Sequence, residues 1–163
     1  MFLYHGTDLR SANNIRKNGI KLSMGDWQTD FGLGFYLATH KGVAKGRAKQ
    51  ASFRTHQHGA ILVYEFDTTD LTILKPNLTK WEDIVLGYRL RGFRYENEMP
   101  KHDAIIGPIA DGKIAAMLNM LTLGHITEKD FRDGLQSKLP GLQIALKTEK
   151  AILSLKLREE LIL

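Results

Sequence analysis

Cysteine is absent from this 163-residue sequence. Its absence excludes disulfide bonds and zinc sites built on thiolates, and it is typical of proteins in a reducing compartment. Long apolar runs are absent too, since no stretch approaches the roughly 20 residues that a membrane-spanning helix needs. The first residues also lack the basic and apolar segments of a signal peptide. We therefore expect a cytoplasmic protein with no membrane partner.

Proline is scarce, with four residues, and no Pro/Ser-rich linker, internal repeat or low-complexity tract divides the chain. A length of 163 residues suits one domain, and a hydrophobic fraction of 43% is enough to build one core. We therefore predict a single domain over residues 1–163.

The hydrophobic periodicity predicts strands and helices that do not alternate strictly. The predicted strands lie at residues 2–5, 34–38, 60–66, 71–74, 103–109 and 143–146. The predicted helices lie at residues 8–18, 40–53, 81–91, 113–123, 127–137 and 149–161. This irregular order favours an α+β fold over a doubly wound parallel sheet.

A first candidate binding cluster is Tyr4-His5-Gly6-Thr7, at the end of the first predicted strand. The His5 imidazole can hydrogen-bond a ribose hydroxyl, and Gly6 lets a flat ligand approach the main chain. A histidine in this position is also compatible with a purely structural or surface role.

A second cluster is the segment Asp30-Phe-Gly-Leu-Gly-Phe-Tyr-Leu-Ala38, in which two glycines precede an aromatic pair. Side chains alternate along a strand, so one of Phe35 and Tyr36 can enter the core while the other lines a cleft. A cleft-facing Tyr36 could stack on a flat aromatic ligand. The alternative is a glycine turn that leads into an ordinary core strand.

A third cluster joins Gln143, at the start of a late predicted strand, to Glu149, at the start of the next predicted helix. Glu149 is most simply a carboxylate that stabilises the helix N-terminus.

Together the three clusters resemble the ADP-ribosyltransferase superfamily, in particular its poly(ADP-ribose)-polymerase-like branch of the His-Tyr-Glu/Gln type. That branch has a His-Gly-Thr/Ser strand, a helix ending in Gly-aliphatic, and a glycine-rich loop. A Gly-x-Gly-Ile/Phe-Tyr-Phe/Leu-Ala strand and a helix come next, and a late strand begins with Glu or a substitute. The matching segments here are His5–Thr7, Asn14–Ile20, Phe31–Ala38 and Leu142–Leu146.

The sequence is also similar to a bacterial group of this superfamily that has a segment like Ile106–Asp111 and whose genes often neighbour antitoxin-like genes. This resemblance implies split antiparallel β-sheets with flanking helices. It implies a mono-ADP-ribosyltransferase that uses NAD⁺ as co-substrate and needs no metal. It also implies the toxin of a toxin–antitoxin pair, with an antitoxin protein as partner.

The resemblance assigns roles to individual residues. His5 would bond a ribose, the Gly6 backbone would hold the nicotinamide amide, and Tyr36 would stack on the nicotinamide ring. Gln143 would stand where many members have a catalytic Glu. The catalytic residues expected are therefore His5, Tyr36 and Gln143. The residues expected to bind NAD⁺ are His5, Gly6, Thr7, Asp30, Phe31, Gly32, Gly34 and Tyr36.

Glutamine in place of glutamate matters for the mechanism. Gln143 can hydrogen-bond the ribose 2′-hydroxyl, but it has no charge with which to stabilise the positive charge that develops on the sugar. This is compatible with transfer of one ADP-ribose unit, or with a catalytically inactive module that binds NAD⁺ or ADP-ribose. Chain elongation is not expected.

The net charge of +5 leaves the acceptor open between protein and nucleic acid. The basic residues are densest at 41–54 and 89–94, which indicates either a solvated surface or a polyanion-binding face. The segment 123–141, which touches the acceptor in the superfamily, has charges of both signs. A basic nucleic-acid-binding regulator is therefore an alternative function. Metal-dependent hydrolysis through His56 and His58 has no third ligand, which favours surface histidines.

Overall fold

The computed structural model describes all 163 residues as an α+β fold built on one seven-stranded sheet. The sheet order is β4-β5-β6-β2-β1-β3-β7, and every neighbouring pair is antiparallel except β4 and β5. The strands are β1 (Phe2–Asp8), β2 (Phe35–Ala38), β3 (Gly59–Phe66), β4 (Ile73–Leu74), β5 (Ala104–Pro108), β6 (Leu142–Leu146) and β7 (Leu155–Ile162).

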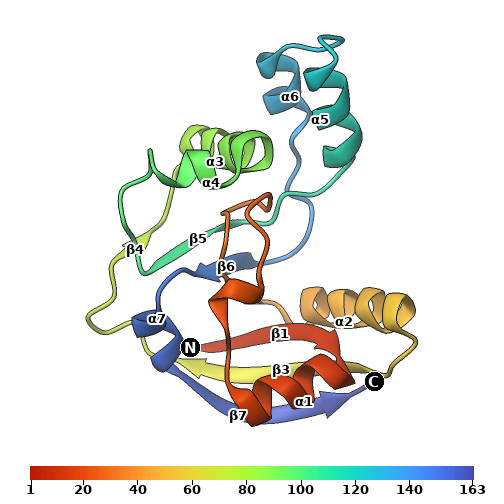
Figure 1. Ribbon diagram of the computed structural model, residues 1–163, viewed down its shortest axis with the longest axis vertical. Helices are drawn as coiled ribbons and strands as arrows, with labels where there is room; N and C mark the ends of the chain where they lie inside the picture. The colour runs from red at the N-terminus through yellow and green to blue at the C-terminus, as the bar shows by residue number, and fades with distance from the viewer.

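The chain also forms seven α-helices (Figure 1). They are α1 (Leu9–Asn18), α2 (Lys41–Thr55), α3 (Leu78–Arg91), α4 (Phe93–Glu96), α5 (Ile114–Thr122), α6 (Glu128–Gly134) and α7 (Glu149–Leu153). A single 3₁₀ turn, Leu22–Met24, follows α1. None of the helices is long and apolar enough to cross a membrane.

The sheet is nearly divided between β1 and β2. These two strands share one register pair, Tyr4 with Ala38, whereas β1 pairs with β3 along its whole length. The prediction of split antiparallel sheets is therefore wrong in two respects, because the strands form one sheet and the β4–β5 pair is parallel. The strands nevertheless diverge beyond the Tyr4–Ala38 pair, and this divergence positions the site.

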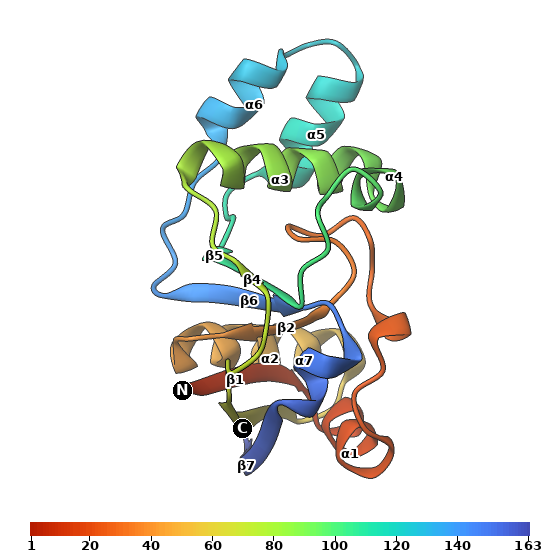
Figure 2. The ribbon, with the colours of Figure 1, turned by 90° about the vertical axis from the view of Figure 1, so that its left-hand side faces the viewer.

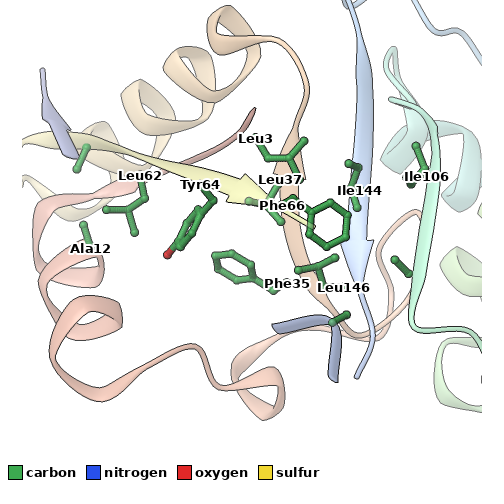
Figure 3. Close-up of a cluster of buried hydrophobic side chains, with 13 residues drawn as sticks. Leu3, Ala12, Phe35, Leu37, Leu62, Tyr64, Phe66, Ile106, Ile144 and Leu146 are labelled. Carbon is green, nitrogen blue, oxygen red and sulfur yellow. The ribbon is translucent and has the colours of Figure 1, made fainter. Parts of the chain in front are cut away.

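One face of the sheet is covered by the largest core cluster, which runs across the junction of β1 and β2 (Figure 3). Leu3 of β1 and Leu37 of β2 both belong to it, together with Ile144 of β6. Helix α1 contributes Ala12 to this cluster. Burial of these apolar side chains holds the two diverging halves of the sheet together where backbone hydrogen bonds do not.

The opposite face is covered by two separate groups of helices. Helix α2 packs on β1 and β3 through Ala44 and Ala48, which contact Ile61 and Val63. Helices α3 and α4 pack over β5 and β6 in a second cluster, in which Trp81 is fully buried (Figure 2). This face therefore has a gap between α2 and α3, directly above the place where β1 and β2 diverge.

Several helix ends follow from the local sequence. The Asp8 side chain accepts a hydrogen bond from the Ser11 N–H at the start of α1, and Gly19 ends that helix with a positive φ. The N-terminus of α6 has a full capping box, since Thr127 and Asp130 each bond the backbone of the other.

The predicted helix over residues 149–161 is wrong. Helix α7 ends at Leu153, and the following residues form β7, which pairs with β3 from Leu155 to Ile162. Leu155 and Ile162 fit a helical spacing, but the strand satisfies the backbone groups along the edge of β3, which a helix would leave unpaired. Tertiary pairing thus overrides the local periodicity.

Helices α5 and α6 form a hairpin that projects from the body of the molecule (Figure 1). Among the apolar side chains of α5, Ile114 is buried in the core. Met117 and Leu121 pack against the same cluster only in part, while Met120 remains exposed.

Candidate functional site

A cavity of about 420 Å³ lies in the gap between α2 and α3. Its floor is formed by residues 4–7 of β1 and 36–38 of β2, where the two strands diverge. One wall is the flank of α2, and the other is made by the loop before β2, Arg89 of α3 and Gln143 of β6. Cavities of this size in proteins hold small molecules and cofactors.

Close packing of α2 against β1 fixes the first wall. A Cβ atom on Gly6 would overlap the backbone carbonyl of Ala44, so only glycine permits this approach. The buried face of α2 is made of Ala44, Ala48 and Ala51, whose small side chains allow the same closeness. The flank of α2 therefore lies directly over the Gly6 backbone, which itself lines the cavity.

His5 bridges the two diverging strands. Its Nδ1 lies 2.8 Å from the carbonyl oxygen of Tyr36, and because a carbonyl can only accept, Nδ1 carries the proton. The ring stacks on Phe35 with centroids 4.3 Å apart. Burial lowers the pKa of His5 below 6.5, so the ring is neutral at pH 7. Its Nε2 makes no hydrogen bond within the protein, so His5, which lines the cavity, retains one free acceptor.

Tyr36 and Phe35 face opposite sides of β2, as their alternation predicts. Phe35 is buried in the core, and Tyr36 lines the cavity. The Tyr36 hydroxyl bonds Thr29 Oγ1 at 2.7 Å, the Gly32 carbonyl at 2.8 Å and the Phe31 N–H at 2.9 Å. Burial raises the pKa of Tyr36, so this hydroxyl fixes the loop and does not titrate near neutral pH. The ring is the part of Tyr36 left for a ligand.

Asp30 is the centre of a buried polar network beneath the cavity. Its Oδ1 accepts from Nε and Nη2 of Arg89, at 3.0 and 2.6 Å. Its Oδ2 accepts from Nε2 of Gln143 at 2.7 Å and from the Ala110 N–H at 3.3 Å. The carboxylate is only 4% exposed and fully engaged, so it positions other groups.

Lys147 holds the same loop from the side of β6. Its Nζ donates to the Phe31 carbonyl at 2.6 Å and to Glu96 at 3.0 Å. Burial lowers the pKa of Lys147, and the Glu96 carboxylate opposes that effect. Together with Tyr36 this lysine fixes the loop at the cavity rim from both sides.

The amide orientation of Gln143 follows from its partners. Nε2 lies 2.7 Å from Asp30 Oδ2 and 3.1 Å from the Pro108 carbonyl, and both partners only accept. The NH₂ group must therefore face them. The carbonyl oxygen Oε1 has no partner and is not enclosed, so it is an acceptor presented to the cavity.

The flank of α2 supplies the positive charge of the cavity. Arg47 and Arg54 both line it, seven residues apart and hence on one face of the helix, with Gln50 between them. Neither guanidinium forms a salt bridge or a hydrogen bond within the protein. Because Asp30 is paired with Arg89, the cavity favours an anionic ligand.

The structure brings six of the expected residues to one cavity and leaves three away from it. His5, Gly6, Thr7, Asp30, Tyr36 and Gln143 line it. Phe31 is fully buried in the α3 cluster. Gly32 adopts φ +71° against the ring of Tyr88, and a Cβ on Gly34 would lie 2.9 Å from the Leu146 carbonyl. These three residues shape the loop without reaching the cavity.

Two other candidates lie elsewhere. Glu149 sits in the first turn of α7, where it was expected as a helix-terminal charge, and does not line the cavity. His56 and His58 lie beyond the C-terminus of α2, and no group of three His, Asp or Glu side chains is arranged to hold a metal ion.

Arg47 and Arg54 were not singled out from the sequence, and neither was Thr29. The signal for the two arginines was the basic segment 41–54, whose interpretation stayed open between a solvated surface and a polyanion-binding face. The structure divides this segment, since only one flank of α2 turns to the cavity.

A family model described as "Protein of unknown function (DUF3990)" matches residues 1–157. The match covers nearly the whole chain, so the chain belongs to this family. No curated protein matches it.

Proposed function

We propose that this member of the DUF3990 family is an NAD⁺-dependent mono-ADP-ribosyltransferase whose site is the cavity between α2 and α3. One observation carries the proposal. Two unpaired acceptors, His5 Nε2 and Gln143 Oε1, and two unpaired guanidinium groups, Arg47 and Arg54, converge on one cavity that also exposes the Tyr36 ring.

The deep end of the cavity suits the nicotinamide half of NAD⁺. The Tyr36 ring supplies a flat aromatic surface for stacking, and the side-chain-free Gly6 leaves its backbone open to a planar amide. The Tyr36 hydroxyl is fully engaged by the loop, so the ring is held in place before any ligand arrives.

The two acceptors suit ribose hydroxyls, which donate hydrogen bonds. Neutral His5 presents Nε2, and Gln143 presents Oε1. The Asp30 carboxylate accepts from the Gln143 amide, which polarises that amide and increases the negative character of Oε1. Gln143 thereby supplies part of the electrostatic stabilisation that a glutamate would give to a ribose on which positive charge develops.

The basic flank of α2 suits the diphosphate. Arg47 and Arg54 have free guanidinium groups, which bind phosphate oxygens with two parallel hydrogen bonds. A dinucleotide that places its nicotinamide against Tyr36 needs its diphosphate near the cavity mouth, and α2 forms that wall.

The cavity side chains also define the chemistry. Cleavage of the bond between ribose and nicotinamide releases a neutral nicotinamide, so the leaving group needs no general acid. Asp30 is the only carboxylate that lines the cavity, and it is fully engaged, so the site offers no free general base. This supports transfer of a single unit to an acceptor that is itself nucleophilic, rather than chain elongation.

The family resemblance supports a role as the toxin of a toxin–antitoxin pair, with a macromolecular acceptor and an antitoxin protein as partner. The engaged Asp30–Gln143 pair also favours a second candidate, a module that binds NAD⁺ or ADP-ribose without turnover. The basic regulator of nucleic acids is the third candidate, and it needs no NAD⁺.

Nicotinamide release and NAD⁺ binding by the purified protein test the proposal. The informative variant is Arg47→Gln/Arg54→Gln, and its matched control is Lys41→Gln/Lys45→Gln on the same helix but away from the cavity. We expect the first variant to weaken NAD⁺ binding by tenfold or more, since each charged hydrogen bond contributes about 1.5–3 kcal/mol. The control should bind as the wild type does.

Saturable binding without nicotinamide release, with and without cell RNA, DNA and protein as acceptors, would leave the inactive module as the function. Equal loss of binding in both variants would show that bulk charge, not the cavity, holds NAD⁺. Absence of binding would remove the cofactor assignment altogether.

A further inference from the structure

Helix α2 carries the whole excess charge of the protein. The chain has 23 Lys and Arg against 18 Asp and Glu, and five of the basic residues lie in α2, which has no acidic residue. The rest of the chain is thus balanced, with 18 charges of each sign. No acidic residue stands between Asp30 and Glu65 in the sequence.

None of the five cations of α2 is neutralised within the fold. Of the 18 arginines and lysines outside α2, eight pair with carboxylates, as Arg16 does with Glu160 and Lys129 with Asp133. The α2 cations form no salt bridge. They are Lys41, Lys45, Arg47, Lys49 and Arg54. An unneutralised helix of one sign attracts a polyanion.

The same helix exposes an aromatic ring. Phe53 is 83% exposed, although its neighbours along α2 include the buried Ala48 and Ala51. Its ring lines a shallow surface hollow together with Lys49, Gln50 and Arg54. An exposed aromatic ring among cations is the arrangement that binds stacked bases along a charged backbone.

We propose that the outward face of α2, defined by Lys45, Lys49 and Phe53 and bordered by Arg54 on the cavity side, is a docking surface for single-stranded nucleic acid. The cations hold the phosphate backbone, and Phe53 stacks on one base. A duplex would satisfy the cations but not Phe53, because its base faces are already stacked on each other. An acidic protein segment would also use the cations, but it would leave the exposed ring without a partner of matching chemistry.

The position of this surface beside the cavity suggests what the docked strand does there. Gln50 and Arg54 line both the cavity and the hollow that contains Phe53, so a strand docked on α2 lies at the cavity mouth. This step rests on the proposed function and makes the docked strand the acceptor. A base nitrogen or oxygen supplies the electron pair of the new bond to the ribose carbon and loses its proton to water. The electrons of the broken bond leave with nicotinamide.

The first test measures binding without NAD⁺, so its outcome does not depend on the transferase activity. Fluorescence anisotropy would follow labelled oligo(U), oligo(dT) and a duplex of about 16 nucleotides, a length that spans a single binding site. We expect Phe53→Leu to weaken single-strand binding by about tenfold and Phe53→Trp to restore it, since a Leu keeps apolar area but cannot stack. Duplex binding should be unchanged in both variants.

Two residues away from α2 provide matched controls. Leu153 is also 83% exposed, and Lys156 is an exposed lysine of β7 without a salt bridge. Leu153→Ala and Lys156→Gln should bind as the wild type does. The slope of log K against log salt is negative, and Lys45→Gln/Lys49→Gln should reduce its magnitude by about 1.4, or roughly 0.7 for each phosphate that is no longer neutralised.

Equal binding by wild type and Phe53→Leu, or tighter binding to the duplex or to anionic lipid vesicles, would overturn the proposal. The preference between oligo(U) and oligo(dT) identifies the strand as RNA or DNA. The second test follows transfer of labelled ADP-ribose to the bound oligonucleotide. The protein could bind the strand and release nicotinamide without adding label to the strand. That result would refute the acceptor role of the strand, while leaving the docking surface and the proposed function in place.

Discussion

The Nδ1 atom of His5 on β1 lies 2.8 Å from the carbonyl oxygen of Tyr36 on β2, across the gap where these two strands stop pairing. A side chain thus takes the place of a backbone partner, which satisfies a carbonyl that the divergence of the strands would leave unpaired. The same hydrogen bond fixes the tautomer and leaves Nε2 to the cavity. One hydrogen bond therefore both bridges the diverging strands and orients the His5 ring beside the cavity.

The protonation of His5 should control ligand binding. Burial lowers the pKa of His5 below 6.5, so the neutral ring and its acceptor Nε2 persist at and above pH 6.5. We expect NAD⁺ affinity and folding stability to be constant above pH 6.5 and to fall as the pH drops through the lowered pKa. Titration calorimetry from about pH 5 to pH 8 measures this. His5→Ala should bind weakly with no such pH dependence, and an unchanged pH profile in that variant would contradict the assignment.

The Tyr36 hydroxyl should matter for the loop more than for the ligand. Tyr36→Phe removes three hydrogen bonds and leaves the Phe31 N–H without a partner, which should cost about 1–3 kcal/mol of folding stability. Urea unfolding measures this loss. At a temperature where the variant is folded, its aromatic ring should keep most of the NAD⁺ affinity, whereas Tyr36→Ala should abolish binding. Equal affinities of Phe and Ala variants would refute stacking.

Replacing Gln143 with glutamate, the residue that many ADP-ribosyltransferases have at this place, should destabilise the protein at neutral pH. Gln143→Glu would place a carboxylate against Asp30 Oδ2 and the Pro108 carbonyl, both of which only accept hydrogen bonds. Repulsion and burial should raise the pKa of the new carboxyl. The folding stability of Gln143→Glu should then match that of the wild type below about pH 4.3, the ordinary pKa of a glutamate. It should fall below that of the wild type as the pH rises through the raised pKa of the new carboxyl. Thermal melts between about pH 4 and pH 8 measure this, and a pH-independent difference would contradict it.

Two glycines near α2 should respond in opposite directions to the same substitution. Gly6→Ala would drive a methyl group into the Ala44 carbonyl and should destabilise the protein by about 1–3 kcal/mol or more, as overpacking does. Gly46 lies in the middle of α2, and a Cβ atom added there would have no other atom within 4 Å. Gly46→Ala should therefore stabilise the fold by about 0.5–1 kcal/mol. The denaturant concentrations at the unfolding midpoints of the two variants and the wild type measure these changes. A Gly6→Ala protein as stable as the wild type would show that α2 does not pack this closely against β1 in solution.

The sequence predicts most local features of the site because they depend on short-range rules. Alternation along β2 correctly predicts that one of Phe35 and Tyr36 enters the core while the other lines a cleft, and in the structure Phe35 is in the core and Tyr36 lines the cavity. The predicted helix starts near residues 8 and 127 are confirmed, because the Asp8 and Thr127 side chains cap these helices through neighbours in the chain.

The features that the sequence does not predict depend on distant pairing. Residues 155–162 have spacing compatible with a helix, but they complete the sheet beside β3, which is far away in sequence. The roles of Arg47 and Arg54 require the approach of α2 to β1, which depends on Gly6 meeting Ala44. The network that fixes the Gln143 amide joins Asp30 to a residue more than a hundred positions later. No local pattern contains these contacts.

The confinement of excess charge to α2 also has a kinetic consequence. A protein whose remaining surface is electrically balanced has a field that points from one helix, so a polyanion is turned toward that helix before contact. The rate of encounter should then fall steeply with ionic strength, while the lifetime of the complex, set by short-range contacts, should change little. The helix that walls the cavity would thus also orient whatever approaches it.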